Sequence, residues 1–242
     1  MTRKIVQVGD RSIEFELYRK KVKNINLRIK SDLTVMVSAP HRVPYRYIEE
    51  FVLQKSSWIF NKLERLRNLP KYTNLKYYNS GETVIFLGKE RSLQVREVGE
   101  KKKKGVVLEE EEIFMYVKDP EDGYHKERLF NNWLKEQATP IFQESLERMY
   151  PLVQTLGVPK PIIRTRKMKI RWGSCSVHKQ SLNLNTALLQ APRKCIDYVV
   201  LHELIHFRHL YHDSYFYSLL DELMPEWKEH KKFLQTHIRC DL

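Results

Sequence analysis

The chain has 242 residues, of which 42% are hydrophobic, so it can bury a full core and is not intrinsically disordered. Its 43 lysines and arginines exceed its 30 acidic residues, and the net charge of +13 favours polyanionic partners, nucleic acid among them. No apolar run approaches the roughly 18–20 residues that cross a bilayer, and neither an export signal nor paired cysteines are found, so we expect a cytoplasmic protein without a membrane partner.

The first half of the sequence is mostly strand-like. Residues 3–17 alternate apolar and polar side chains, and residues 24–40 hold two further alternating runs around a short turn, which is typical of a hairpin. One stretch, residues 45–68, has its apolar side chains near one stripe and predicts a helix. Three short apolar runs then predict strands at 83–88, 92–98 and 113–117.

The second half predicts helices around two strands. Residues 125–156 form the longest helical pattern, in which Pro140 is a kink or a boundary. Two strand-like runs and three helical patterns follow, at 161–176, 181–192, 195–210, 216–223 and 226–237. We therefore expect an α+β protein with a β-rich N-terminal region, residues 1–120, and an α+β region, residues 121–242, which meet at KDPEDG.

A histidine cluster lies in VVLHELIHFRHLYHDSYF, residues 199–216. Residues four apart lie on one face of an α-helix, so His202 and His206 can bind one metal ion. Glu203 points about 100° away from His202 and can accept a proton from water instead of binding the metal. The neighbouring residues are apolar, and unpartnered histidines and a glutamate would be costly among them. The pattern H-E-x-x-H therefore predicts a metal site with a general base.

A catalytic zinc usually has three protein ligands and one open position. His209 lies on the same stripe, but in a straight helix it is about 10 Å along the axis from His202. If the helix ends after His209, the chain can return His212 to the metal, because Asp213 and Ser214 are typical of helix caps. His212 is therefore the favoured third ligand. The alternatives that stay open are His209, Glu222, Glu226 and His230.

The segment HELIHFRHLYHDSYF resembles the core of the YgjP-like metallopeptidase family, which is related to the SprT/Spartan-type and WLM-type proteases. The stretches RWGSCS, residues 171–176, and SLNLNTALLQAP, residues 181–192, are also similar to this family. The resemblance implies a zincin-like metallopeptidase domain over residues 121–242 and a peptide or protein substrate. It also implies one zinc ion bound by His202, His206 and His212, with Glu203 as the general base.

Further side chains are candidates to support the reaction. His209, Tyr211 and Tyr215 are expected behind the ligands or as donors to the oxyanion, although packing is the commoner role of a tyrosine. Cys175 is expected to be a small buried residue, because no paired histidine marks it as a nucleophile.

Two segments are candidates to hold the substrate. The resemblance places Trp172, Gly173 and Ser174 beside the metal. A protease often binds its substrate as an added strand, and the strand through Asn183 and Asn185 is a candidate for that edge.

The leading interpretation is a cytoplasmic zinc-dependent peptidase. One alternative is a nucleic-acid-associated protein, or a protease that acts on DNA-bound proteins, since the chain is basic around Arg164–Arg171. Another is a metal hydrolase of a non-peptide amide or ester, because H-E-x-x-H specifies the water chemistry better than the substrate.

Overall fold

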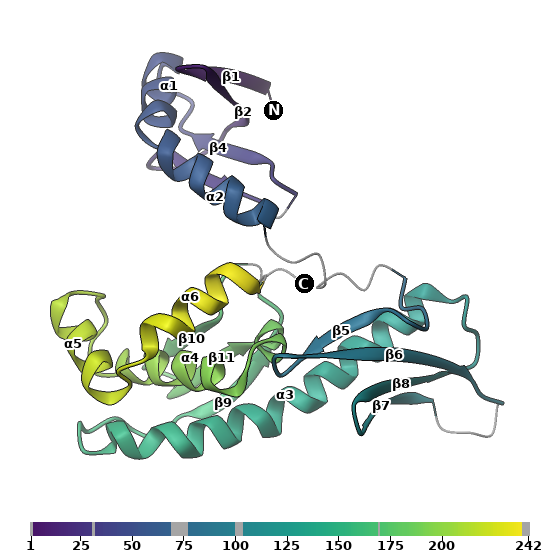
Figure 1. The fold of residues 1–242 in the computed structure, drawn as a ribbon. Coiled ribbons are helices and arrows are strands. Elements are labelled where there is room, and N and C mark those ends of the chain that lie inside the picture. Colours follow the sequence, from purple (N-terminus) through teal and green to yellow (C-terminus); the bar gives the residue numbers. More distant parts are fainter. Residues whose placement is uncertain (1, 31, 69–76, 100–103, 169, 239–242) are drawn as a thin grey trace. The chain divides into compact units, whose positions relative to one another are not determined.

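The computed structural model describes residues 2–30, 32–68, 77–99, 104–168 and 170–238 (Figure 1). The elements are those of an α+β protein whose N-terminal part is rich in strands, so the predicted class is confirmed. The chain divides into a first unit, Met1–Leu69, and a second unit, Pro70–Leu242. No helix among the described residues is both long enough and apolar enough to cross a membrane.

The first unit is a four-stranded sheet with two helices. Its strands are β1 (Thr2–Val8), β2 (Arg11–Arg19), β3 (Asn26–Ile29) and β4 (Val35–Ala39), in the order β1-β2-β4-β3. Alternate residues such as Phe15 and Val37 are buried, as the period of two predicts, and they form one core with Ile48, Val52 and Ile59. The single helix predicted over 45–68 is two helices that separate at Lys55, α1 (Tyr45–Gln54) and α2 (Ser56–Asn68).

The second unit begins with a sheet of the same topology. Its strands are β5 (Thr83–Phe86), β6 (Lys89–Glu97), β7 (Gly105–Glu109) and β8 (Glu112–Val117), in the order β5-β6-β8-β7. In both sheets two antiparallel hairpins are joined by a parallel pair, β2 with β4 and β6 with β8. The first hairpin of each turns at a glycine with positive φ, Gly9 and Gly88. The chain therefore contains two copies of one four-stranded arrangement.

A long helix, α3 (Gly123–Gln154), runs along this sheet and the next one (Figure 1). It continues through Pro140, so no boundary forms there. Trp133 packs on Phe86 with ring centroids 5.1 Å apart, which joins the helix to β5. The boundary expected near residue 120 falls within the second unit, between β8 and α3.

The third sheet has the order β10-β11-β9 and is formed by β9 (Ile162–Arg166), β10 (Gly173–Ser176) and β11 (Ser181–Asn185). The strand predicted over 161–176 is two strands, β9 and β10, and between them the side-chain amide of Asn185 donates to the carbonyl oxygens of Met168 (2.8 Å) and Arg171 (2.9 Å). The strand predicted over 181–192 ends in a short 3-10 helix, η2 (Thr186–Gln190). Three helices complete the unit, α4 (Arg193–Ile205), α5 (Ser214–Leu223) and α6 (Trp227–His237).

Candidate metal centre

Helix α4 carries His202 and Glu203 in its last turn. The helix is fixed to α3 by Asp197, whose buried carboxylate accepts hydrogen bonds from Ser145 (2.6 Å) and Arg148 (2.7 Å). It ends at Ile205, five residues before the predicted end, and His206 is its C-cap. The amides of Arg208 and His209 then donate to the carbonyl of Ile205 (both 2.9 Å), so the chain turns away from the helix axis.

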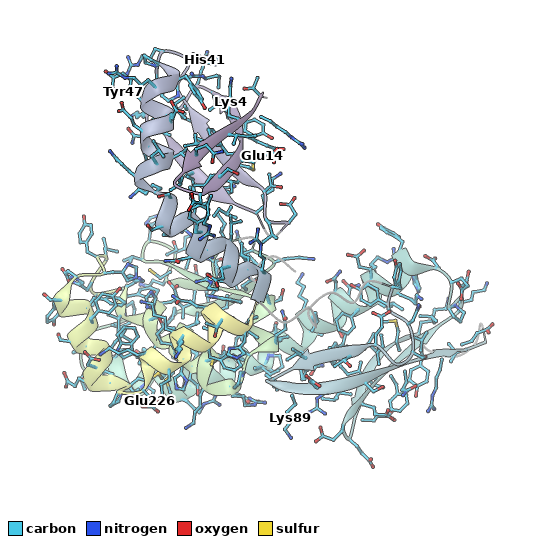
Figure 2. All side chains as sticks on the ribbon, turned by 45° about the horizontal axis from the view of Figure 1, so that its top comes forward. Lys4, Glu14, His41, Tyr47, Lys89 and Glu226 are labelled. Carbon is cyan, nitrogen blue, oxygen red and sulfur yellow. The ribbon has the colours of Figure 1, made fainter. Side chains whose placement is uncertain are left out.

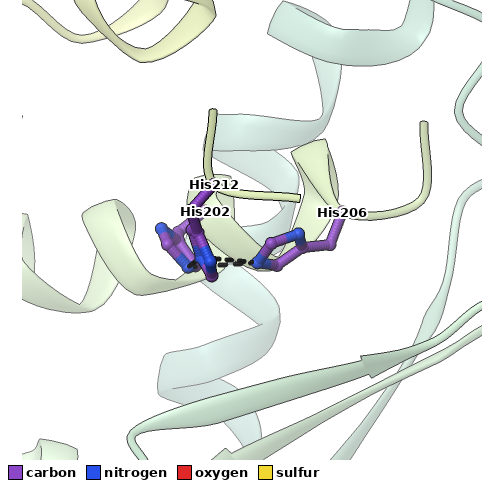
Figure 3. A group of neighbouring side chains, drawn as sticks. All are labelled: His202, His206 and His212. Atoms are coloured by element: carbon purple, nitrogen blue, oxygen red, sulfur yellow. Dashed lines mark hydrogen bonds between the residues drawn. The ribbon is translucent and has the colours of Figure 1, made fainter. Parts of the chain in front are cut away.

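This turn brings three imidazoles together (Figure 3). The Nε2 atom of His206 is 3.2 Å from Nε2 of His202 and 3.0 Å from Nε2 of His212. The Nε2 atoms of His202 and His212 are 2.9 Å apart. Nitrogen ligands with bonds of about 2.1 Å in a tetrahedron lie roughly 3.4 Å apart, so this spacing is close to that of a metal site. No other group of three or more metal-ligating side chains gathers in this way among the described residues.

The protonation of these histidines also suits a metal. Nδ1 of His206 lies 3.0 Å from the carbonyl oxygen of His209, and donation there leaves the Nε2 lone pair free. Burial lowers the pKa of His202 to about 3, and burial also lowers the pKa of His206 and of His212. All three imidazoles are therefore neutral at pH 7, as metal ligands must be. The three donors fit a divalent transition metal.

Phe216 packs behind all three imidazoles. Its ring centroid is 4.9, 4.7 and 4.8 Å from those of His202, His206 and His212, and the side chain is fully buried. Asp213 positions it by accepting a hydrogen bond from the Phe216 amide (3.1 Å) as the N-cap of α5. The sequence signal for this contact was the aromatic residue four positions after His212.

His209 lies outside the three-histidine group. Its Nε2 is 2.8 Å from the carboxylate of Asp213, and only its backbone carbonyl contacts His206. The rings of His209 and Tyr215 are 5.3 Å apart, while Tyr211 is 73% exposed. Neither tyrosine is among the residues that line the cleft described below.

Glu203 is buried against β10. A Cβ atom on Gly173 would lie 2.9 Å from Oε1 and 2.8 Å from Cγ of Glu203, so no larger residue fits at Gly173 without displacing the carboxyl group. Burial raises the pKa of Glu203 to about 7, and a hydrogen bond from the Cys175 amide and the charge of Arg171 act in the opposite direction. This carboxyl can therefore both accept and release a proton near neutral pH.

The histidines and Glu203 open into a cleft of about 560 Å³. One wall comes from residues 171–175, which include the expected Trp172, Gly173 and Ser174. The other comes from α4 and the following loop, with Tyr198, Val199 and Leu210. Tyr198 was missed in the sequence, although it lies four residues before His202 and so on the same helical face.

Asn183 and Asn185 do not form a free edge. Both lie on β11, which pairs with β10 on one side and with β9 on the other, so the expectation that this strand offers an edge to the substrate is wrong. The side-chain amide of Asn185 instead donates to the carbonyl oxygens of Met168 and Arg171. The strand beside the metal centre that has one neighbour within the described sheet is β10.

A model of the YgjP-like metallopeptidase domain matches residues 23–237. No curated protein matches the chain. Among solved structures, the metallopeptidase zymogen of Pyrococcus abyssi abylysin is 26% identical, covers 39% of this chain and 92% of its own, and has a TM-score of 0.35. The metallopeptidase zymogen of Methanocaldococcus jannaschii jannalysin is 23% identical, covers 38% of this chain and 90% of its own, and has a TM-score of 0.32. Because the family model covers most of the chain and the resemblance is thereby confirmed, the protein belongs to the YgjP-like metallopeptidase family.

Proposed function

We propose that this protein is a zinc-dependent peptidase in which His202, His206 and His212 bind the metal and Glu203 is the general base. The observation that carries the proposal is the convergence of three Nε2 atoms within 3.2 Å of one another in a cleft that Glu203 also lines. A metal is implied by the family, and three neutral imidazoles are a common ligand set for zinc.

The side chains around the site divide the chemistry among them. Zinc, when bound, supplies a Lewis acid that polarises the peptide carbonyl and makes water more acidic. Glu203, which lines the same cleft as the three histidines, takes the proton from water and passes it to the leaving amine. The Cys175 amide and Gly173 hold the carboxyl in place, and Phe216 holds the imidazoles.

We assign the substrate-binding edge to β10 rather than β11. Gly173, Ser174 and Cys175 line the cleft, and the antiparallel pairing of β10 with β11 leaves the other side of β10 without a strand in the described sheet. An extended peptide that pairs there would run past Glu203, since added-strand binding places the backbone along the edge.

The test of the proposal is hydrolysis of a quenched fluorescent peptide library by the zinc-loaded protein and by Glu203→Gln. We expect Glu203→Gln to keep the metal and to lose roughly 100-fold or more of the activity, because only the proton acceptor is removed. Full activity in this variant would rule out the mechanism. A parallel panel of esters and non-peptide amides tests the alternative substrate class.

We also propose a cytoplasmic location. The support is that Cys175 and Cys195 are free thiols in the structure, as is usual in a reducing compartment.

Nucleic acid is a second candidate partner, and one observation favours it. Between Arg19 and Arg46 the sequence has eight lysines and arginines against the single acid Asp32. His41 of this segment and the half-exposed Tyr47, which directly follows it, lie near the start of α1 (Figure 2). Fluorescence anisotropy with labelled DNA and RNA tests the candidate: binding should weaken steeply with salt, and no binding at low salt would remove it.

A further inference from the structure

Lys231 of α6 lies on an aromatic wall behind the histidines. Its Nζ is 5.3 Å from the ring centroid of Tyr217 and 5.2 Å from that of Trp227, two rings that stack 5.3 Å apart. Tyr217 is also 6.4 Å from His212, and Trp227 stacks 6.2 Å from Tyr198, whose ring is 5.8 Å from that of His202. The two rings thus hold the ammonium group close to the site.

The charge of Lys231 is not neutralised by an ion pair within the described residues. Its neighbour Lys228 also lies over Trp227, at 5.4 Å, but the Nζ of Lys228 is 3.0 Å from the carboxylate of Asp221. One lysine of α6 is therefore paired with Asp221, and the other lies beside the aromatic ring that neighbours His212.

Arg171 supplies a positive charge within the cleft itself, whereas Lys231 lies outside the residues that line it. Arg171 lines the cleft, and its backbone carbonyl accepts a hydrogen bond of 2.9 Å from the side-chain amide of Asn185. Among the residues that line the cleft, Glu203 is the only acidic one. A divalent metal would add two further positive charges, so the loaded cleft carries a clear excess of positive charge. Such a site binds an anion more readily than a neutral group.

We infer that the cleft selects peptides with a carboxylate close to the scissile bond, and that Arg171 and Lys231 determine this preference. The inference rests on the proposed peptidase function and specifies its substrate class. A guanidinium group can hold a carboxylate through two hydrogen bonds, whereas an ammonium group acts as a point charge. The carboxylate has two possible sources, an aspartate or glutamate side chain and the C-terminus of the peptide.

The experiment measures binding to the zinc-loaded Glu203→Gln protein, which does not consume its ligand. The probes are fluorescein-labelled alanine heptapeptides with glutamate at each position in turn, and the same peptides with glutamine. Each is made as the free acid and as the C-terminal amide, which separates the two sources of the carboxylate. Dissociation constants come from fluorescence anisotropy at low and at 0.5 M salt.

We expect a glutamate at one position of the peptide, or the free C-terminus, to lower the dissociation constant roughly five- to tenfold relative to the matching glutamine or amide peptide. Salt at 0.5 M should reduce this preference. Arg171→Gln and Lys231→Gln should each remove most of it, whereas Arg171→Lys and Lys231→Arg should retain part of it. Lys228→Gln is the matched control on α6 and should leave the preference unchanged.

The inference is overturned if carboxylate and neutral peptides bind equally, if no peptide binds, or if the preference survives in both glutamine variants. Hydrolysis of the same peptides by the wild-type protein is measured in parallel. Cleavage without a carboxylate preference would refute the inference and leave the peptidase intact, whereas a binding preference without any cleavage would refute the peptidase function alone.

Discussion

At the scale of single residues, the site depends on close contacts around Glu203. Gly173 has no side chain where the carboxyl of Glu203 lies, and Cys175 contributes a backbone amide instead of its thiol. Neither role follows from the type of residue alone. Both follow from the approach of β10 to α4.

Gly173→Ala should separate catalysis from metal binding. The new Cβ would lie within 3.1 Å of three atoms of Glu203, so the carboxyl must shift, and a shift of about 1 Å can cost roughly 100-fold in rate. We expect kcat/KM to fall by this order while the metal content is unchanged. Gly105→Ala is the control, because nothing lies within 4 Å of its added Cβ. Equal activity of the two variants would contradict the placement of Glu203.

The thiol of Cys175 should be unreactive at neutral pH. Burial, with a smaller contribution from the charge of Glu203, raises its pKa to about 11. A raised pKa keeps the thiol protonated, so about 0.1% is thiolate at pH 8, and alkylation should accelerate as the pH rises towards 11. Iodoacetamide labelling at several pH values, read by mass spectrometry, measures this. Cys175→Ala should keep full peptidase activity, and a large loss would indicate a role for the thiol itself.

At the scale of elements, the hairpin between β5 and β6 supports the start of α4. The amides of Leu87 and Gly88 donate to the carbonyls of Leu189 (2.6 Å) and Gln190 (3.1 Å). A Cβ on Gly88 would lie 2.7 Å from Cγ of Pro192, the residue before α4. At the corresponding glycine of the first sheet, Gly9, an added Cβ meets nothing within 4 Å.

Gly88→Ala should therefore destabilise the protein more than Gly9→Ala. Both glycines have positive φ, 79° and 60°, so both variants incur backbone strain, but only Gly88→Ala also meets Pro192. We expect Gly88→Ala to lower the free energy of unfolding by about 1–3 kcal/mol and to weaken metal binding. Urea denaturation and zinc titration of both variants measure this. Similar losses in the two would mean that the hairpin does not position α4.

Elements differed in how well the sequence predicted them. The apolar periods of the first sheet and of α3 were readable because they are local patterns. The order β10-β11-β9 was not, because strand order depends on contacts between distant segments. The end of α4 at Ile205 was also missed, since the turn there is made by backbone hydrogen bonds without a proline or glycine.

At the scale of the whole molecule, the second unit joins one copy of the repeated sheet to the part that carries the candidate metal centre. Phe86 and Leu93 of that sheet belong to the same core as Leu201 and Phe216. That residues 121–242 form a metallopeptidase domain by themselves stays a prediction. The candidate site was more predictable than this division, because His202, Glu203 and His206 lie on one helix end and His212 follows within six residues. Arg171 ends a basic stretch that the sequence already showed, whereas Lys231 comes from a distant segment and no local pattern indicated it.

The central claim is that His202, His206 and His212 bind one metal ion. Elemental analysis of the wild type, His212→Ala and His209→Ala, purified side by side, tests it most directly. We predict about one zinc ion per chain in the wild type and in His209→Ala, and loss of zinc in His212→Ala, because Nε2 of His209 faces Asp213 instead of the other histidines. Zinc retained in His212→Ala and lost in His209→Ala would contradict the account.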